Sequence, residues 1–213
     1  MPLRITNVMA VSLDGRIASH PGERDEARHE LGFTNDDDHA HVLALLRATD
    51  AVIVGSASLM ASGGAFVGPN DRGVQPIWAV LTNRGLPEGD PFLAQAEVPR
   101  WLVSQQPLPL PPHTGIVRTI AYASESPALV VAKALAGAGV ERALLFGGSE
   151  INRLFYAAGL VDQLILTVCP VIIAAQAAVG LVAPTLPAPV KLTLLASQPQ
   201  GNLVFLTYNV QKD

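Results

Sequence analysis

Short, mostly apolar segments alternate with segments of helical periodicity along most of the chain. The apolar runs predict strands over residues 5–12, 51–54, 77–81, 101–103, 116–119, 143–146 and 163–171. Helices are predicted between them, over residues 35–48, from 56, over 126–138 and from 149 to 158. Strands that alternate with helices build a largely parallel sheet with helices on its faces.

The last two apolar segments, residues 191–197 and 202–210, predict an antiparallel hairpin that closes the chain and makes the sheet mixed. The expected fold is therefore α/β, with a single mixed, mostly parallel sheet of about eight or nine strands flanked by helices. One domain over residues 1–213 is expected.

Polar residues mark the start of the first long helix. Thr34 is a suitable N-cap, and Asp36, Asp37 and Asp38 would lie in the first turn, where the helix dipole favours anions. The charged segment 20–32 before this helix is predicted to be a surface loop.

Composition narrows the classes of function. The chain is 49% hydrophobic and 15% charged, which allows a large buried core. A net charge of -4 without a basic run argues against nucleic acid and anionic membranes as partners. No signal peptide is expected, and the longest mostly apolar run, residues 164–175, contains Pro170 and is too short to span a bilayer. The single cysteine, Cys169, excludes an intrachain disulfide and agrees with a cytoplasmic location.

A glycine pair after one strand suits a ligand-binding loop, because ligands of open α/β sheets bind beyond the carboxyl ends of the strands. Gly147 and Gly148 allow a pyrophosphate to approach the backbone, and a helix from Ser149 would present free N–H groups to it. A tight strand-to-helix turn without a ligand explains these residues equally well. The segment matches neither GxGxxG nor a P-loop.

Two further strand ends carry small or polar residues. Thr82, Asn83 and Arg84 offer a hydroxyl, an amide and a guanidinium, which suit a phosphate monoester such as the 2′-phosphate of NADP. An ordinary solvated turn is the simpler interpretation. Gly55 and Ser56 form another strand-to-helix junction, with the same two interpretations open.

The first strand ends at Ser12 and Asp14, and Asp14 either orients a substrate or forms an Asx turn with the glycine that follows. Other chemistries fit poorly. His39 and His41 do not share a helix face, so no metal site is expected. The lack of a Gly-x-Ser-x-Gly elbow and of His-x-Glu with paired cysteines argues against a serine hydrolase and a zinc deaminase.

Five stretches in a fixed order carry a family resemblance: AVSLDGRIA (10–18), DAVIVG (50–55), FGGSEIN (146–152), AGLVD (158–162) and LILTVCPVI (164–172). From the first to the last they are spread over most of the chain. In this order and at these spacings they resemble the reductase domain of the riboflavin-pathway bifunctional deaminase-reductase. That domain has the dihydrofolate reductase fold, so the resemblance implies a dihydrofolate-reductase-like sheet.

The resemblance also implies NADPH as cofactor and Ser12 and Asp14 near the substrate. Asp14 is the predicted proton donor, with a bound water as the alternative. The implied cofactor contacts are Ala10 and Ile17 beside the nicotinamide, Gly55 and Ser56, Thr82, Asn83 and Arg84 near the 2′-phosphate, Ser104 on the adenosine side, and Gly147, Gly148, Ser149, Glu150 and Ile151 around the pyrophosphate.

The implied reaction is hydride transfer from NADPH that reduces the ribosyl group of 5-amino-6-(5-phosphoribosylamino)uracil to ribityl, in riboflavin biosynthesis. This sequence has no zinc deaminase half, so a separate deaminase would have to supply the substrate. It also departs from the family twice: SGGAF (62–66) replaces an Asp-Asn-Pro or Asp-Asp-Pro motif that helps to hold the ribose phosphate, and Phe146 replaces a frequent glutamate. An NADPH reductase of the same fold for another small C=N or C=C substrate, and a non-catalytic ligand-binding relative, therefore stay open.

The chain is expected to form a homodimer. Residues 161–173 and the terminal hairpin are more apolar than the edge of a monomeric sheet should be, and an exposed apolar edge tends to pair. The resembled family is also dimeric.

Overall fold

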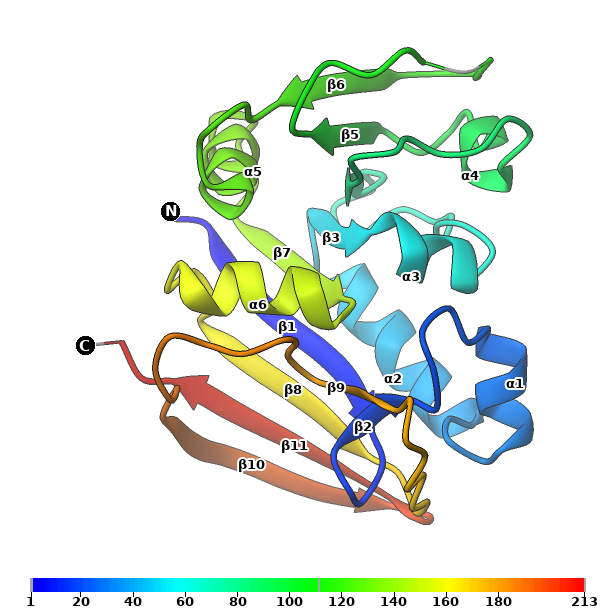
Figure 1. Cartoon of the computed structure of the whole chain (residues 1–213), viewed down its shortest axis with the longest axis vertical. Helices are drawn as coiled ribbons and strands as arrows, with labels where there is room; N and C mark the ends of the chain where they lie inside the picture. Colours follow the sequence, from blue (N-terminus) through cyan, green and yellow to red (C-terminus); the bar gives the residue numbers. More distant parts are fainter. Residues whose placement is uncertain (1, 111, 213) are drawn as a thin grey trace.

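The computed structural model describes residues 2–110 and 112–212. Its main sheet has nine strands in the order β10-β11-β8-β1-β7-β3-β4-β5-β6 (Figure 1). In chain order these strands are β1 (Arg4–Val11), β3 (Ala51–Gly55), β4 (Ile77–Leu81), β5 (Arg100–Ser104), β6 (Val117–Ala121), β7 (Arg142–Gly147), β8 (Gln163–Val168), β10 (Leu192–Gln200) and β11 (Leu203–Val210). A short second sheet pairs β2 (Arg16–Ala18) with β9 (Val179–Gly180).

The strand directions confirm the predicted mixed, mostly parallel sheet. All neighbours from β8 across to β6 run parallel, whereas β11 is antiparallel to both β8 and β10. The interior strand β3 is buried over its whole length, because its apolar residues are covered on both faces.

Helices cover both faces of the sheet. On one face α5 (Pro127–Gly137) and α6 (Ser149–Ala157) pack against the strands through Val131 and Phe155. On the other face α2 (Asp36–Arg47), α3 (Ser56–Ala61) and α4 (Pro91–Ala94) contribute Leu46, Leu59 and Phe92 to a second core. The short helix α1 (Asp25–Glu30) precedes α2 (Figure 1).

Three local expectations are corrected. The N-cap of α2 is Asn35 rather than Thr34, because the Asn35 side chain accepts a hydrogen bond from the backbone N–H of Asp38 (3.1 Å). The segment 20–32 contains α1 and is not entirely loop. Strand β8 ends at Val168 instead of residue 171, since Pro170 has no N–H to continue the ladder.

The longest helix among the described residues, α2, has 12 residues. No helix in residues 2–110 and 112–212 combines the length and the hydropathy that a bilayer crossing needs.

Candidate functional site

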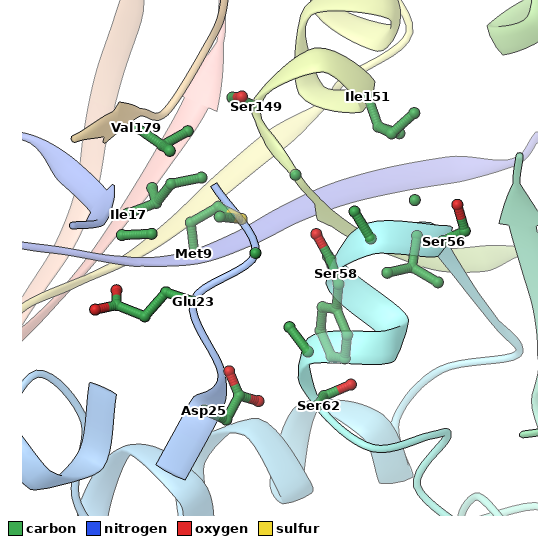
Figure 2. A pocket seen from close by; sticks show the side chains of 18 of the residues that line it. Met9, Ile17, Glu23, Asp25, Ser56, Ser58, Ser62, Ser149, Ile151 and Val179 are labelled. Carbon is green, nitrogen blue, oxygen red and sulfur yellow. The ribbon is translucent and has the colours of Figure 1, made fainter. Parts of the chain in front are cut away.

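A cavity of about 1500 Å³ lies at the carboxyl ends of the central strands. Because β1, β7, β3 and β4 are parallel neighbours, the loops that follow them meet at one edge of the sheet. Figure 2 shows Met9 and Ile17 on one side of this cavity and Ser56 and Ser58 of α3 on the other. The first residues of α6, including Ile151, form a further part of the wall.

The turn between β7 and α6 brings backbone N–H groups to the cavity. Gly147 and Gly148 have φ of 67° and 55°, a region that residues with a side chain rarely adopt. No side chain caps α6, and its first backward hydrogen bond runs from the N–H of Asn152 to the carbonyl of Gly148 (2.9 Å). The three preceding N–H groups therefore have no acceptor among the described residues, and they can bind an anion.

A side chain at either glycine would fill this turn. A Cβ on Gly147 would lie 2.2 Å from Oδ1 of Asn152, and one on Gly148 would lie 2.9 Å from Oγ of Ser58. Gly55 is similarly close to α6, because a Cβ there would lie 2.9 Å from Cγ1 of Ile151. Because β3, β7 and α6 approach each other closely, this part of the cavity wall consists of glycine backbone without side chains.

A buried amide network fixes the position of α6. The Nδ2 of Asn7 donates to Oδ1 of Asn152 (3.1 Å), and Nδ2 of Asn152 donates to the carbonyl of Leu181 (2.8 Å). Burial raises the pKa of Tyr156 above its usual range, so its hydroxyl stays protonated and donates to Oδ1 of Asn7 (3.2 Å). The network ties α6 to β1 and to the loop after β9.

The end of β4 forms a second, more polar corner. The hydroxyl of Thr82 donates to the carbonyl of Gly85 (2.9 Å), and Oδ1 of Asn83 accepts from the hydroxyl of Tyr122 (2.9 Å). The exposed side chain of Arg84 also lines the cavity, but it makes no hydrogen bond or ion pair with any residue that the structure describes. The hydroxyl of Thr82 and the amide oxygen of Asn83 are thus engaged within the protein, whereas the guanidinium of Arg84 is available to bind a phosphate.

A family model matches the sequence of this chain over almost its whole length. Residues 4–206 match the model of the family described as the RibD C-terminal domain. The chain belongs to this family. The resemblance stated from the five sequence stretches is therefore confirmed, whereas a search of the curated proteins found no match.

Solved structures show the fold of this RibD C-terminal domain. A pyrimidine reductase-like protein from Corynebacterium diphtheriae superposes with a TM-score of 0.77 at 19% identity, covering 99% of this chain and 93% of that chain. A diaminohydroxyphosphoribosylaminopyrimidine deaminase/5-amino-6-(5-phosphoribosylamino)uracil reductase from Thermotoga maritima gives 0.77 at 17% identity, covering 99% of this chain but 57% of that one. Dihydrofolate reductase from Enterococcus faecalis, complexed with NADP(H), gives 0.57 at 14% identity, covering 98% and 97%. The expected dihydrofolate-reductase-like fold is confirmed.

Most of the cofactor contacts expected for the RibD C-terminal domain gather on the wall of this one cavity. The expected contacts that line it are Ala10, Ile17, Gly55, Ser56, Thr82, Asn83, Arg84, Gly148, Ser149, Glu150 and Ile151. Gly147 shapes the turn from behind this wall. Ser104 is buried and donates to the carbonyl of Gln106 (2.7 Å), while Gln105 and Tyr122 line that side instead.

Ser12 and Asp14 do not lie on the described wall of the cavity. Asp14 accepts hydrogen bonds from the hydroxyl of Ser12 (2.6 Å) and from the backbone N–H groups of Ile173 and Ala174 (both 3.0 Å). These bonds, that from Ser12 foremost, hold the pKa of Asp14 at about 2. The geometry makes Asp14 a tie between two loops, and its roles as proton donor and substrate contact stay predictions.

The residues of the cavity wall that sequence reasoning missed include Glu23, Asp38, Trp78 and Arg153. Arg153 lies one helical turn beyond Ser149 and Glu150, and this spacing was the available signal. The departure at Phe146 has a structural consequence, because its ring packs edge-on against Trp78, with centroids 6.2 Å apart, on the wall of the cavity.

Proposed function

We propose that this RibD C-terminal domain is an NADPH-dependent reductase. One observation carries the proposal: the turn at Gly147 and Gly148 brings three N–H groups of α6 that have no acceptor among the described residues to a cavity that also exposes Arg84. The two features supply what a pyrophosphate and a 2′-phosphate need, which are backbone donors without side-chain obstruction and a fixed positive charge.

The residues of the chain would bind and orient the cofactor. Ala10 and Ile17 would flank the nicotinamide ring with apolar surface, and the first turn of α6 would hold the pyrophosphate. When bound, NADPH supplies a hydride from C4 of its nicotinamide, while the protein contributes position and electrostatics.

The resemblance indicates 5-amino-6-(5-phosphoribosylamino)uracil as the first candidate substrate, with the ribosyl group reduced to ribityl. A second candidate class is another small C=N or C=C substrate, and it is favoured by the residues that replace the Asp-Asn-Pro motif. In that region Ser62 and Phe66 line the cavity without a carboxylate. A relative that binds ligands without catalysis would show no oxidation of NADPH with either class.

The experiment compares the dissociation constants of NADPH and NADH for wild type and Arg84→Ala. Loss of one partly exposed contact to a charged group costs on the order of 1–3 kcal/mol, which is roughly a fivefold to hundredfold weaker affinity for NADPH. The affinity for NADH should change little, because it has no phosphate at this position. Arg47→Ala removes an exposed arginine outside the cavity wall and serves as the control.

Equal losses for both cofactors would show that Arg84 does not distinguish the 2′-phosphate. A wild type that prefers NADH, or that binds neither cofactor, would refute the proposed function itself.

We also propose that the protein forms a homodimer through β10. This edge strand is exposed along all nine residues, and Leu194 and Leu195 keep 53% and 54% of their surface accessible. A long edge with apolar side chains is a surface that pairs readily with a second copy.

A further inference from the structure

Three hydrogen-bonded side chains follow β2 at the cavity. The hydroxyl of Ser19 donates to Oε1 of Glu23 (2.6 Å) and lies 2.8 Å from Nδ1 of His20. The backbone N–H of Ser19 donates to Oε2 of the same carboxylate (2.8 Å). His20 and Glu23 both line the cavity, as does Ile17, the residue expected beside the nicotinamide. Figure 2 shows Ile17 and Glu23, which precede and follow His20, on the same side of the cavity.

The side chains of Glu23 and His20 differ in their access to solvent. Glu23 keeps 4% of its side-chain surface accessible, whereas His20 keeps 57%. The Nε2 atom of His20 makes no hydrogen bond or ion pair with any residue in 2–110 or 112–212. An imidazole on a cavity wall with one nitrogen held and the other available can exchange a proton both with water and with a bound ligand.

The hydrogen bonds of Ser19 assign the tautomer of the His20 ring. A hydroxyl has one proton to donate, and that of Ser19 goes to Glu23, because an ionised carboxylate can only accept. The oxygen of Ser19 must therefore accept from His20, which places a proton on Nδ1. Nε2 is then the nitrogen that takes up and releases a proton. When the ring is protonated, the carboxylate of Glu23, 4.0 Å from Nδ1, attracts its charge.

We infer that His20 is the catalytic proton donor of the reductase, and that Ser19 and Glu23 are the positioning residues that orient its ring. The inference rests on the proposed function and adds to it the group that protonates the substrate. A ring held by a hydroxyl and a carboxylate matches the general arrangement in which a third group orients a catalytic base or acid. Asp14, the donor expected from the sequence, does not line the described wall, and the hydrogen bond from Ser12 foremost lowers its pKa to about 2.

In 5-amino-6-(5-phosphoribosylamino)uracil the bond that must break joins C1′ to the ring oxygen of the ribosyl group. Protonated His20 gives the proton of Nε2 to this oxygen, while the electron pair of the attached amino nitrogen forms C=N with C1′. C1′ then receives the hydride that NADPH supplies, and the C=N pair returns to nitrogen. The ribosyl group is thereby reduced to ribityl, NADPH is oxidised to NADP⁺, and neutral His20 regains a proton from water.

A purely structural role is the competing explanation, because the same hydrogen bonds close the turn from Ser19 to Glu23. That turn needs the carboxylate of Glu23 and the backbone N–H of Ser19, but it needs no imidazole. His20→Ala and His20→Gln therefore remove the proton donor and keep the turn. His29 provides the matched control, because it is an exposed histidine on the same cavity wall whose side chain makes no hydrogen bond with any described residue.

The first measurement does not depend on activity. Nitrogen-15 NMR of the full chain reports which ring nitrogen of the neutral imidazole carries the proton. In wild type, His20 should carry it on Nδ1, and Ser19→Ala should lose this preference, because the accepting oxygen is gone. The dissociation constant of NADPH should be the same for wild type, His20→Ala and His29→Ala, since a proton donor to the substrate does not hold the cofactor.

The second measurement is the rate of NADPH oxidation in a single turnover with 5-amino-6-(5-phosphoribosylamino)uracil. His20→Ala and His20→Gln should slow it by about 10²–10⁴-fold, the usual contribution of a general acid. His29→Ala should match wild type. Added imidazole should speed up His20→Ala and leave wild type unchanged, because the free base replaces only a missing proton donor. A residue that merely stabilised the turn would show no such rescue.

A His20→Ala variant that reacts as fast as wild type, or whose loss imidazole does not restore, would overturn the inference. A proton on Nε2 of the neutral His20 ring in wild type would overturn the assigned orientation. A wild type that does not oxidise NADPH with this substrate would refute the proposed function for it, and the inferred step with it. An active wild type with a fully active His20→Ala would refute only the role of His20.

Discussion

Replacing Gly147 with alanine is expected to destabilise the protein far more than the same change at Gly159. Both glycines have similar positive φ values, 67° and 64°, so alanine meets the same backbone strain at each. Only Gly147 is obstructed, since its Cβ would lie 2.2 Å from Oδ1 of Asn152, whereas a Cβ on Gly159 meets no atom within 4 Å. Gly159 is therefore a matched control for the strain alone.

The expected loss of unfolding free energy follows from the hydrogen bonds that the Asn152 side chain would lose. Left-handed backbone strain for alanine costs about 1–2 kcal/mol, which sets the expectation for Gly159→Ala. At Gly147 the amide of Asn152 must also move away from Asn7 and Leu181, and each buried hydrogen bond left unmade costs about 1–3 kcal/mol. Gly147→Ala should therefore lose on the order of 3–8 kcal/mol, a large part of the stability of an ordinary domain.

Urea unfolding followed by circular dichroism measures both losses as shifts of the midpoint at constant m-value. The double variant Gly147→Ala/Asn152→Ala isolates the clash, because it removes the obstructing amide. In the Asn152→Ala background, Gly147→Ala should cost no more than Gly159→Ala does. If it costs the full amount there, the contact with Asn152 is not the cause and the reasoning fails.

Two further predictions concern the edge strand and Asp14. Light scattering at micromolar concentration should give a dimer mass for wild type but a monomer mass for Leu194→Lys. Leu13→Lys is the control and should stay a dimer, because Leu13 is 63% exposed but lies away from β10. A monomeric wild type would refute the dimer. The pKa of Asp14 is lowered from 3.8 to about 2, foremost by the hydrogen bond from Ser12, so its ionised form stabilises the fold above pH 4 and this contribution is lost as the pH falls toward 2. Asp14→Asn should accordingly be less stable than wild type at pH 7, and unfolding curves that showed no narrowing of this difference between pH 4 and 2 would contradict the assignment.

The elements that border the cavity were predictable because each has a strong local pattern. Strand β3 is a short run of small and β-branched residues before a glycine, and the pair Gly147 and Gly148 marks the start of α6. In contrast, α1 buries none of its residues, so the sequence has no apolar periodicity from which this helix could be predicted. Strands β2 and β9 have three and two residues, and such short pairings depend on the rest of the fold.

The place of Asp38 on the inward face of α2 was missed, although helix geometry makes it predictable. The sequence presents three consecutive aspartates in the first turn of a helix, and only the rotational phase of the helix decides which one faces inward. The apolar residues that pack on the sheet fix that phase. Val42 and Leu46 follow Asp38 by four and eight residues, so all three lie on one face of α2. The tight hydrogen bonding of Asp14, in contrast, depends on Ile173 and Ala174, which are remote in the sequence.

The place of β1 in the middle of the sheet has a consequence for how the chain acquires its structure during synthesis. Strands β3, β4, β5 and β6 are neighbours in the order in which they are made, so they can associate as the chain emerges. Strand β1 is made first, but Nδ2 of Asn7 finds its acceptor, the carbonyl of Leu145, 138 residues later. Long-range pairing of this kind slows folding and leaves an apolar strand exposed to aggregation. Because β1 also forms one wall of the cavity, a ligand can assist folding only after β7 and β8 have joined it.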